Sequence, residues 1–166
     1  MKMSIGLLGV VAASAAWAAP TRVGPAVAVT ASQVHCPSGT TLSGGKDSPL
    51  EAFVCVRTSA DGNREFDGPY VALYPSGLKL AEGQYLRGFR SGLWKYFDKA
   101  GVEYSKIEFR RGDYHGLRTE NYPSGQKKFE ETWVEGKRQG LQRYWDDKGA
   151  LTELVYKDDR PVVAAK

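Results

Sequence analysis

The sequence predicts an all-β protein, in which an antiparallel meander of repeated 24-residue β-hairpins follows a signal peptide. Glycines recur every 24 residues, turn sequences end at one set of them, and short segments rich in Tyr, Trp, Phe, Val and Leu lie between the turns. Self-similarity at periods of about 20–50 residues is typical of repeat architectures. Turn residues interrupt every apolar run before about ten residues accumulate, so the pattern favours strands over helices.

Residues 1–18 have the features of a cleaved export signal. Lys2 supplies a positive charge, residues 5–16 are apolar, and Ala16-Trp17-Ala18 matches the small-x-small cleavage pattern. The apolar stretch is too short for a membrane-spanning helix, which needs about 20 apolar residues. We therefore expect cleavage near Ala18 and a periplasmic or extracellular chain.

The next two segments are expected to be a flexible linker, residues 19–34, and a leader closed by a cystine, residues 35–61. An even pair of cysteines in an exported chain predicts a disulfide between Cys36 and Cys55. Two free thiols or half of a metal site are the alternatives, although closed zinc coordination lacks ligands because His35 and His115 are the only histidines. Residues 52–56 resemble a strand and Asp61-Gly62 a hairpin turn, so the leader is expected to be one strand pair.

The repeat domain is expected over residues 62–160, with about four repeats and a tail at 161–166. We predict that two glycine series spaced by 24 residues lie in turns: Gly68, Gly92, Gly116 and Gly140, and nine residues later Gly77, Gly101, Gly125 and Gly149. Each glycine of the later series ends a type I turn sequence, as in Tyr74-Pro75-Ser76-Gly77. A second loop with glycine at both ends is expected at residues 88–92, 112–116 and 136–140.

Aromatic residues are the other periodic feature. Tyr85, Phe109 and Trp133 form a 24-residue column, which ends at Lys157 in the atypical last unit. The first and third repeats share Tyr-Pro-Ser-Gly, and the second and fourth share an aromatic pair followed by Asp, which suggests a duplicated 48-residue pair. Aromatic pairs across strands stabilise a sheet, whereas exposed ones mark a binding surface. The candidate interaction aromatics are Tyr70, Trp94, Tyr96, Tyr144 and Trp145.

No combination of residues in the sequence predicts catalysis, so we expect no catalytic, cofactor-binding or metal-binding site. Neither histidine belongs to a nucleophile motif, no phosphate-binding glycine loop is present, and no aspartates have calcium-loop spacing. Ser38, Ser76 and Ser124 lie in Pro-Ser-Gly, which the turn interpretation explains. The formal net charge of +4 is a mild basic excess and does not indicate a nucleic-acid partner.

The run Gly92-Leu93-Trp94-Lys95-Tyr96-Phe97, followed by Gly101 and then by Gly112 and Gly116, resembles the bacterial MORN-repeat variant. The resemblance covers residues 62–155, and such chains are grouped with YwqK-type antitoxins of toxin–antitoxin systems. It implies a β-hairpin repeat protein whose surface binds another protein. We therefore expect a non-enzymatic interaction scaffold. The alternative is an envelope module that binds cell-wall glycan or lipid headgroups through exposed aromatic residues.

Overall fold

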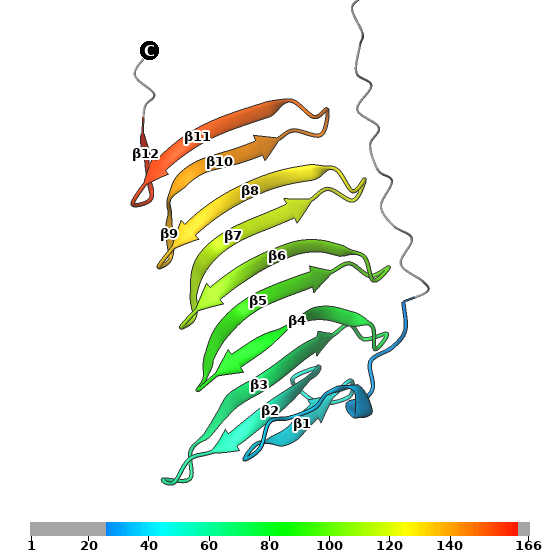
Figure 1. Cartoon of the computed structure of the whole chain (residues 1–166). Coiled ribbons are helices and arrows are strands. Elements are labelled where there is room, and N and C mark those ends of the chain that lie inside the picture. Colours follow the sequence, from blue (N-terminus) through cyan, green and yellow to red (C-terminus); the bar gives the residue numbers. More distant parts are fainter. Residues whose placement is uncertain (1–25, 163–166) are drawn as a thin grey trace, which may run out of the picture.

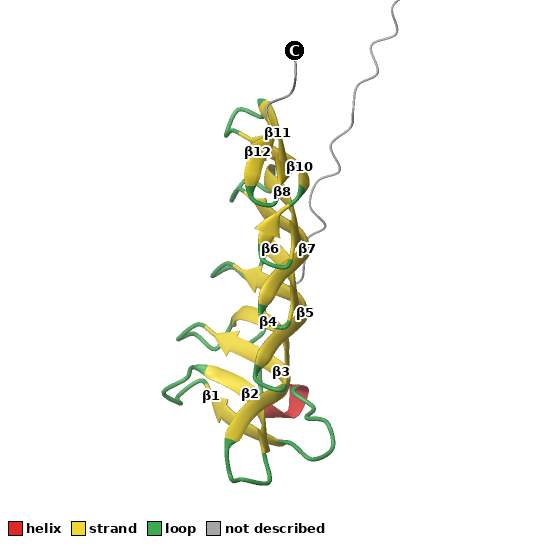
Figure 2. Cartoon of the chain, turned by 90° about the vertical axis from the view of Figure 1, so that its left-hand side faces the viewer, coloured by secondary structure: helices red, strands yellow, loops and turns green. Residues whose placement is uncertain are grey.

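The computed structural model describes residues 26–162 and contains one antiparallel sheet (Figure 1). The predicted signal peptide, residues 19–25 of the predicted linker and residues 163–166 lie outside the described residues. Each strand pairs with the next along the chain from β1 to β8, and β10, β11 and β12 continue the sheet. Short β9 pairs with β8 beside this path. The predicted all-β antiparallel meander is therefore confirmed, and an edge-on view shows a single twisted layer (Figure 2).

The sheet comprises twelve strands, preceded by a three-residue 3-10 turn, η1, at Ala31–Gln33. The first six strands are β1 (Thr41–Gly45), β2 (Ala52–Thr58), β3 (Arg64–Leu73), β4 (Lys79–Leu86), β5 (Phe89–Phe97) and β6 (Glu103–Arg110). The others are β7 (Asp113–Asn121), β8 (Lys127–Val134), β9 (Lys137–Arg138), β10 (Gly140–Trp145), β11 (Leu151–Lys157) and β12 (Arg160–Val162).

The type I turn sequences all lie at the same end of the strands, where they join β3 to β4, β5 to β6, β7 to β8 and β10 to β11. In the first, the amide of Gly77 donates to the carbonyl of Tyr74 at 2.8 Å, and the same bond recurs at Gly101, Gly125 and Gly149. The φ angles of these four glycines lie between 81° and 86°. A type I turn followed by a residue of positive φ is a common three-residue hairpin loop, and glycine adopts that φ without steric cost.

The connections at the opposite end of the strands are shorter than the sequence suggested. Strands β4 and β5 are joined by Arg87 and Gly88 alone, with φ angles of 50° and 81°. Equivalent pairs follow at 111–112 and 135–136, and Asp158–Asp159 joins β11 to β12. Two successive residues of positive φ are typical of type I′ turns, whose twist matches that of the strands. The predicted five-residue loops with glycine at both ends are therefore wrong.

The glycines that begin each repeat also lie in strands rather than in turns. Gly68, Gly92 and Gly116 lie inside β3, β5 and β7, and Gly140 begins β10, so their predicted place in turns is wrong. At Gly92 the strand pairing is irregular. Glu82 pairs with Lys95 and Gln84 pairs with Ser91, so residues 82–84 of β4 lie opposite the longer stretch 91–95 of β5. Such an irregularity needs a residue of unusual φ, and Gly92 has a φ of 66°.

The segment before β1 is attached to the sheet by the predicted disulfide. Cys36, which precedes β1, bonds to Cys55 on β2 with 5.5 Å between the two Cα atoms. The segment before Cys36 packs on the same strands, because Val34 is buried with Phe53 and Leu73. The amide of Val29 also donates to the carbonyl of Gly77 at 3.0 Å. Residues 29–36, most of them in the predicted linker, thus contact the sheet.

Loss of this disulfide is expected to destabilise the fold by about 3 kcal/mol, because the bond closes a loop between residues 19 apart. The measurement is urea unfolding of the Cys36→Ser/Cys55→Ser variant against the oxidised and dithiothreitol-treated wild type. The variant and the reduced wild type are expected to share one lowered midpoint. An unchanged midpoint, or two alkylatable thiols in protein isolated without reductant, contradicts the prediction.

Two contacts beside the type I turns recur 48 residues apart. The phenol of Tyr74 donates to the carbonyl of Phe97 at 2.8 Å, and that of Tyr122 donates to the carbonyl of Trp145 at 2.9 Å. Lys79 lies over the ring of Phe97 in the same way that Lys127 lies over Trp145. In the intervening turns Asp98 and Asp146 accept hydrogen bonds from their own turn amides. These contacts give a physical reason for the two alternating turn sequences.

Candidate interaction surfaces

The sheet has two chemically different faces, because alternate side chains of a strand point to opposite sides. We call one side the aromatic face; it carries Tyr85, Trp94, Phe109, Tyr114 and Trp133. The other side is the leucine face, defined by Leu93, Leu117 and Leu141. Val34 and its neighbours cover the leucine face over β2 and β3. From β5 onward, no other element of residues 26–162 covers either face (Figures 1 and 2).

The aromatic face carries a continuous line of rings across five strands. Ring centroids are 5.3 Å apart for Tyr85 and Trp94, 5.8 Å for Trp94 and Phe109, 5.1 Å for Phe109 and Tyr114, and 5.2 Å for Tyr114 and Trp133. Each pair meets edge to face, the arrangement that aromatic quadrupoles favour. The predicted column of Tyr85, Phe109 and Trp133 is thus joined by a ring from each intervening strand.

Trp94 is the centre of this line and is only 1% exposed. Its indole lies against Gly83 on β4, where an added Cβ would overlap the ring, and its Nε1 donates to the carbonyl of Gln84 at 3.2 Å. The guanidinium of Arg90 covers the ring from outside, 4.7 Å from its centroid. Trp94 was predicted to be an interaction aromatic, and this burial excludes it, because no partner at the surface reaches its ring.

The other candidate aromatics are half-buried and do not form one patch. Tyr70 packs on Trp94 with centroids 5.4 Å apart, and burial raises the pKa of both Tyr70 and Tyr96. Tyr144 lies farther along the sheet beside Phe129, at 6.5 Å. Trp145 lies beside a type I turn, under Lys127. The structure therefore groups Tyr70 with Trp94 but leaves Tyr144 and Trp145 apart from them.

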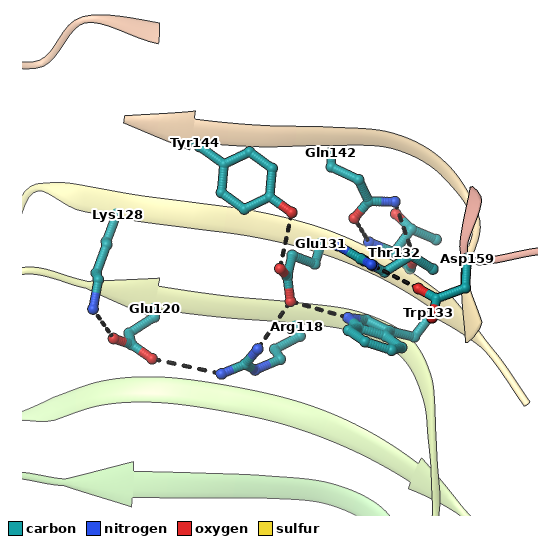
Figure 3. Close-up of polar contacts among 10 residues, drawn as sticks. Arg118, Glu120, Lys128, Glu131, Thr132, Trp133, Gln142, Tyr144 and Asp159 are labelled. Atoms are coloured by element: carbon teal, nitrogen blue, oxygen red, sulfur yellow. Dashed lines mark hydrogen bonds and ion pairs between the residues drawn. The ribbon is translucent and has the colours of Figure 1, made fainter. Parts of the chain in front are cut away.

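A polar network around a buried carboxylate joins the aromatic packing in the third and fourth repeats (Figure 3). Glu131 on β8 is 7% exposed and accepts from Arg118 at 2.9 Å, from the Trp133 indole at 3.1 Å and from the Tyr144 phenol at 3.0 Å. Burial, and then the hydrogen bond to Glu131, raises the pKa of Tyr144. Nearby, Gln142 is fully buried and exchanges hydrogen bonds with the backbone of Thr132. No periodic pattern in the sequence predicts these polar contacts.

The leucine face exposes a column of large apolar side chains. Leu93, Leu117 and Leu141 are 50%, 48% and 38% exposed, and each directly follows one of the strand glycines. They lie on β5, β7 and β10, which are separated by single strands, and Val155 lies opposite Leu141 on β11. The 24-residue spacing of these leucines is present in the sequence and is the signal by which this column could be predicted.

A groove borders this column beside residues 33–35. It has a volume of about 430 Å³, and its lining includes Val34, His35, Val71 and Leu93. Glu82 and Lys95 supply opposite charges at its floor. The other histidine, His115, is not in the groove; its Nδ1 atom is buried without a hydrogen-bond partner in the described part of the chain.

Neither a metal site nor a membrane-spanning helix is found in residues 26–162. No three His, Cys, Asp or Glu side chains in that range are grouped so that they could hold a metal ion. The helical structure there is nowhere long and apolar enough to cross a bilayer.

Comparisons with known proteins do not assign a family. No protein-family model matches the chain, and no curated protein matches it. Among solved structures, it is similar to a chain in the "Crystal structure of GtfA/B complex bound to UDP and GlcNAc", with 17% identity and a TM-score of 0.40. The match covers 80% of this chain but 27% of that one. This similarity is too low to transfer an activity or a ligand.

Proposed function

We propose that the chain is a non-enzymatic scaffold that binds another protein through its leucine face. The observation that supports this proposal most strongly is the column of exposed leucines on β5, β7 and β10. Single exposed apolar residues are normal on soluble proteins, whereas apolar side chains gathered on one surface mark interaction sites. The aromatic face is a weaker candidate because its largest ring, Trp94, is already buried.

The segment of residues 29–36 indicates what kind of polypeptide fits the face. Val34 packs against Phe53 and Leu73, so an irregular segment with apolar side chains already covers the leucine face over β2 and β3. That cover ends at the groove beside Leu93. We infer that the partner supplies a similar extended segment, which continues across the strands from Leu93 towards Leu141.

Two cations beside the leucines, Lys95 and Arg143, already have carboxylate partners, whereas Lys106 and Arg110 on the same face have none in residues 26–162. Lys95 lies 3.9 Å from Glu82 and 3.6 Å from Glu103. Arg143 lies 3.7 Å from Glu130 and 2.9 Å from Glu153. Because Lys95 and Arg143 already have carboxylate partners, they offer little attraction to lipid headgroups, which bind through clustered unpaired basic residues.

The compartment limits which partner is available. The disulfide indicates a non-reducing environment, because disulfides are rare in reducing cytosol. As part of the proposal, export follows cleavage near Ala18 and places the chain in the periplasm or outside the cell. If the resemblance to YwqK-type antitoxins reflects function, the toxin must act in that same compartment.

A leucine-face substitution tests the proposal. We expect Leu117→Glu to reduce recovery of a stoichiometric partner from envelope extract at least about tenfold, because it places a charge in an apolar contact. The melting temperature should stay nearly unchanged, since substitutions at exposed positions usually alter stability by less than about 0.5 kcal/mol.

The matched control is Leu154→Glu, an exposed leucine on the opposite face, which should recover the partner like the wild type. Equal loss in both variants, or no loss in either, contradicts the proposed surface. Sedimentation of the wild-type protein with purified wall or liposomes, without a stoichiometric protein partner, would instead support the ligand-binding alternative.

A further inference from the structure

Three arginines lie over aromatic rings on the aromatic face. The guanidinium carbon of Arg90 is 4.7 Å from the ring centroid of Trp94, that of Arg118 is 4.5 Å from Phe129, and that of Arg138 is 4.2 Å from Tyr156. Stacking on a ring uses the flat side of a guanidinium and leaves the N–H groups at its edge available for hydrogen bonds. All three arginines are therefore placed to bind a carboxylate.

Two of the three bind a carboxylate of this chain. Arg118 donates to Glu131 at 2.9 Å, and Arg138 donates to Asp159 at 2.6 Å. Arg90 forms no ion pair with any carboxylate in residues 26–162. The groups that act on its guanidinium are the phenols of its cross-strand partner Tyr85 and of Tyr96 and Tyr114. Among the three ring-stacked arginines, Arg90 is thus the one without a carboxylate partner in residues 26–162.

The surroundings of Arg90 hold the charged group in place. The ring of Phe109 on β6 lies 5.3 Å from the same guanidinium carbon. The Arg90 side chain thus packs on rings from two neighbouring strands, β5 and β6. Burial lowers the pKa of Arg90, but the interactions with Tyr85, Tyr96 and Tyr114 outweigh burial and raise it above its ordinary value. The residue is nevertheless exposed to solvent. A guanidinium that already packs on two rings has fewer conformations to lose when it binds an anion.

We propose that Arg90, with the surrounding tyrosine phenols, is a binding site for the side-chain carboxylate of an Asp or Glu from another polypeptide. The site would reproduce with an external ligand what Glu131 and Asp159 do for Arg118 and Arg138. Carboxylates match the planar fork of a guanidinium and form two parallel hydrogen bonds with it. The site lies on the face opposite the leucine column, so it does not depend on the proposed function.

NMR titration of the ¹⁵N-labelled chain tests the site. The probes are a blocked Ala-Asp-Ala tripeptide, its Ala-Asn-Ala analogue and sodium glucuronate. We expect the Asp peptide to shift the Arg90 Nε–H and Trp94 indole signals saturably, with a Kd on the order of 10 mM or weaker, because a single ion pair at an exposed site contributes little. The Asn analogue should produce no saturable shift, because it lacks the charge.

Arg90→Gln should weaken binding of the Asp peptide about tenfold or more, and Arg90→Lys should weaken it less because the charge remains. The matched control is Arg110→Gln, an exposed arginine on the opposite face of β6, which should bind like the wild type. Equal shifts with both peptides, unchanged binding in Arg90→Gln, or no shift with any probe would overturn the site. Tighter binding of glucuronate than of the Asp peptide would overturn its assignment to a polypeptide.

Discussion

Truncation of Phe109 to alanine is expected to lower the free energy of unfolding by about 3–5 kcal/mol. Phe109 is only 5% exposed, and its ring meets Trp94 on one side and Tyr114 on the other. The substitution therefore leaves a cavity in the middle of the line of rings and also removes the edge-to-face contacts, which add to the cost of lost burial. Urea unfolding monitored by tryptophan fluorescence measures the loss.

Lys157→Ala is the control for this prediction. Lys157 stands 48 residues after Phe109 in the sequence and is exposed. It is not part of the aromatic column, because Tyr156 pairs with Gly140 as Phe109 pairs with Gly92, so the column continues at Tyr156 and the predicted end at Lys157 is wrong. Its removal should change stability by less than about 0.5 kcal/mol. A Phe109→Ala variant that melts like the wild type but loses its partner would show that the rings form a binding surface rather than a structural line.

The sequence was sufficient for the fold class and for one covalent link. The spacing of the glycines, together with Pro, Asp and Ser in the turns, predicted an antiparallel meander, and the two cysteines predicted a disulfide. Both predictions rest on local chemistry. A type I turn followed by glycine specifies its own geometry, and two cysteines in an oxidising compartment leave few alternatives.

The length of the two-residue hairpin turns, such as Arg87-Gly88, is not predictable from the sequence pattern for a physical reason. A type I′ turn needs two residues of positive φ, and glycine supplies only the second one here. The first is Arg87, Arg111 or Glu135, residue types that rarely adopt this conformation, so the sequence gives little sign of where the turn begins. The strand glycine four residues after the turn glycine, such as Gly92 after Gly88, therefore resembles the end of a loop in the sequence.

The burial of Trp94 was also beyond the sequence pattern. A single-layer sheet is expected to leave large rings exposed, but two neighbours add to the ring contacts that bury this indole. Gly83, across the strand pair, gives the indole room to lie flat, and Arg90 covers its outer side. Gly83 is not in either of the predicted glycine series, so nothing in the 24-residue pattern indicated its role.

The same cross-strand geometry explains why the third repeat does not simply copy the second. Trp94 pairs with Ile107, and 24 residues later Arg118 pairs with Glu131. The neighbour of Arg118 on its other side is Ile107, where Trp94 has glycine in the equivalent place. An indole at position 118 would meet that isoleucine side chain. A flexible arginine fits, and its charge then needs the buried carboxylate of Glu131.

Removal of this carboxylate is the second large effect that we expect. Glu131→Ala should cost about 3 kcal/mol, the lower part of the range for breaking a buried ion pair. The indole of Trp133 and the phenol of Tyr144 lose their acceptor, and Arg118 loses its closest carboxylate. The lower value is expected because Glu120, 3.8 Å from Arg118, retains part of the compensation for its charge.

Two further measurements separate the loss of the network from a general loss of packing. The Arg118→Ala/Glu131→Ala double variant should be destabilised by less than the sum of the two single variants, because neither charge is then left without its partner. Spectrophotometric titration should show that Glu131→Ala lowers the pKa of Tyr144 towards its ordinary value, since the hydrogen bond to Glu131 contributes to the upward shift. Strict additivity together with an unchanged tyrosine titration would mean that the carboxylate is solvated and that the polar network does not hold the third and fourth repeats together.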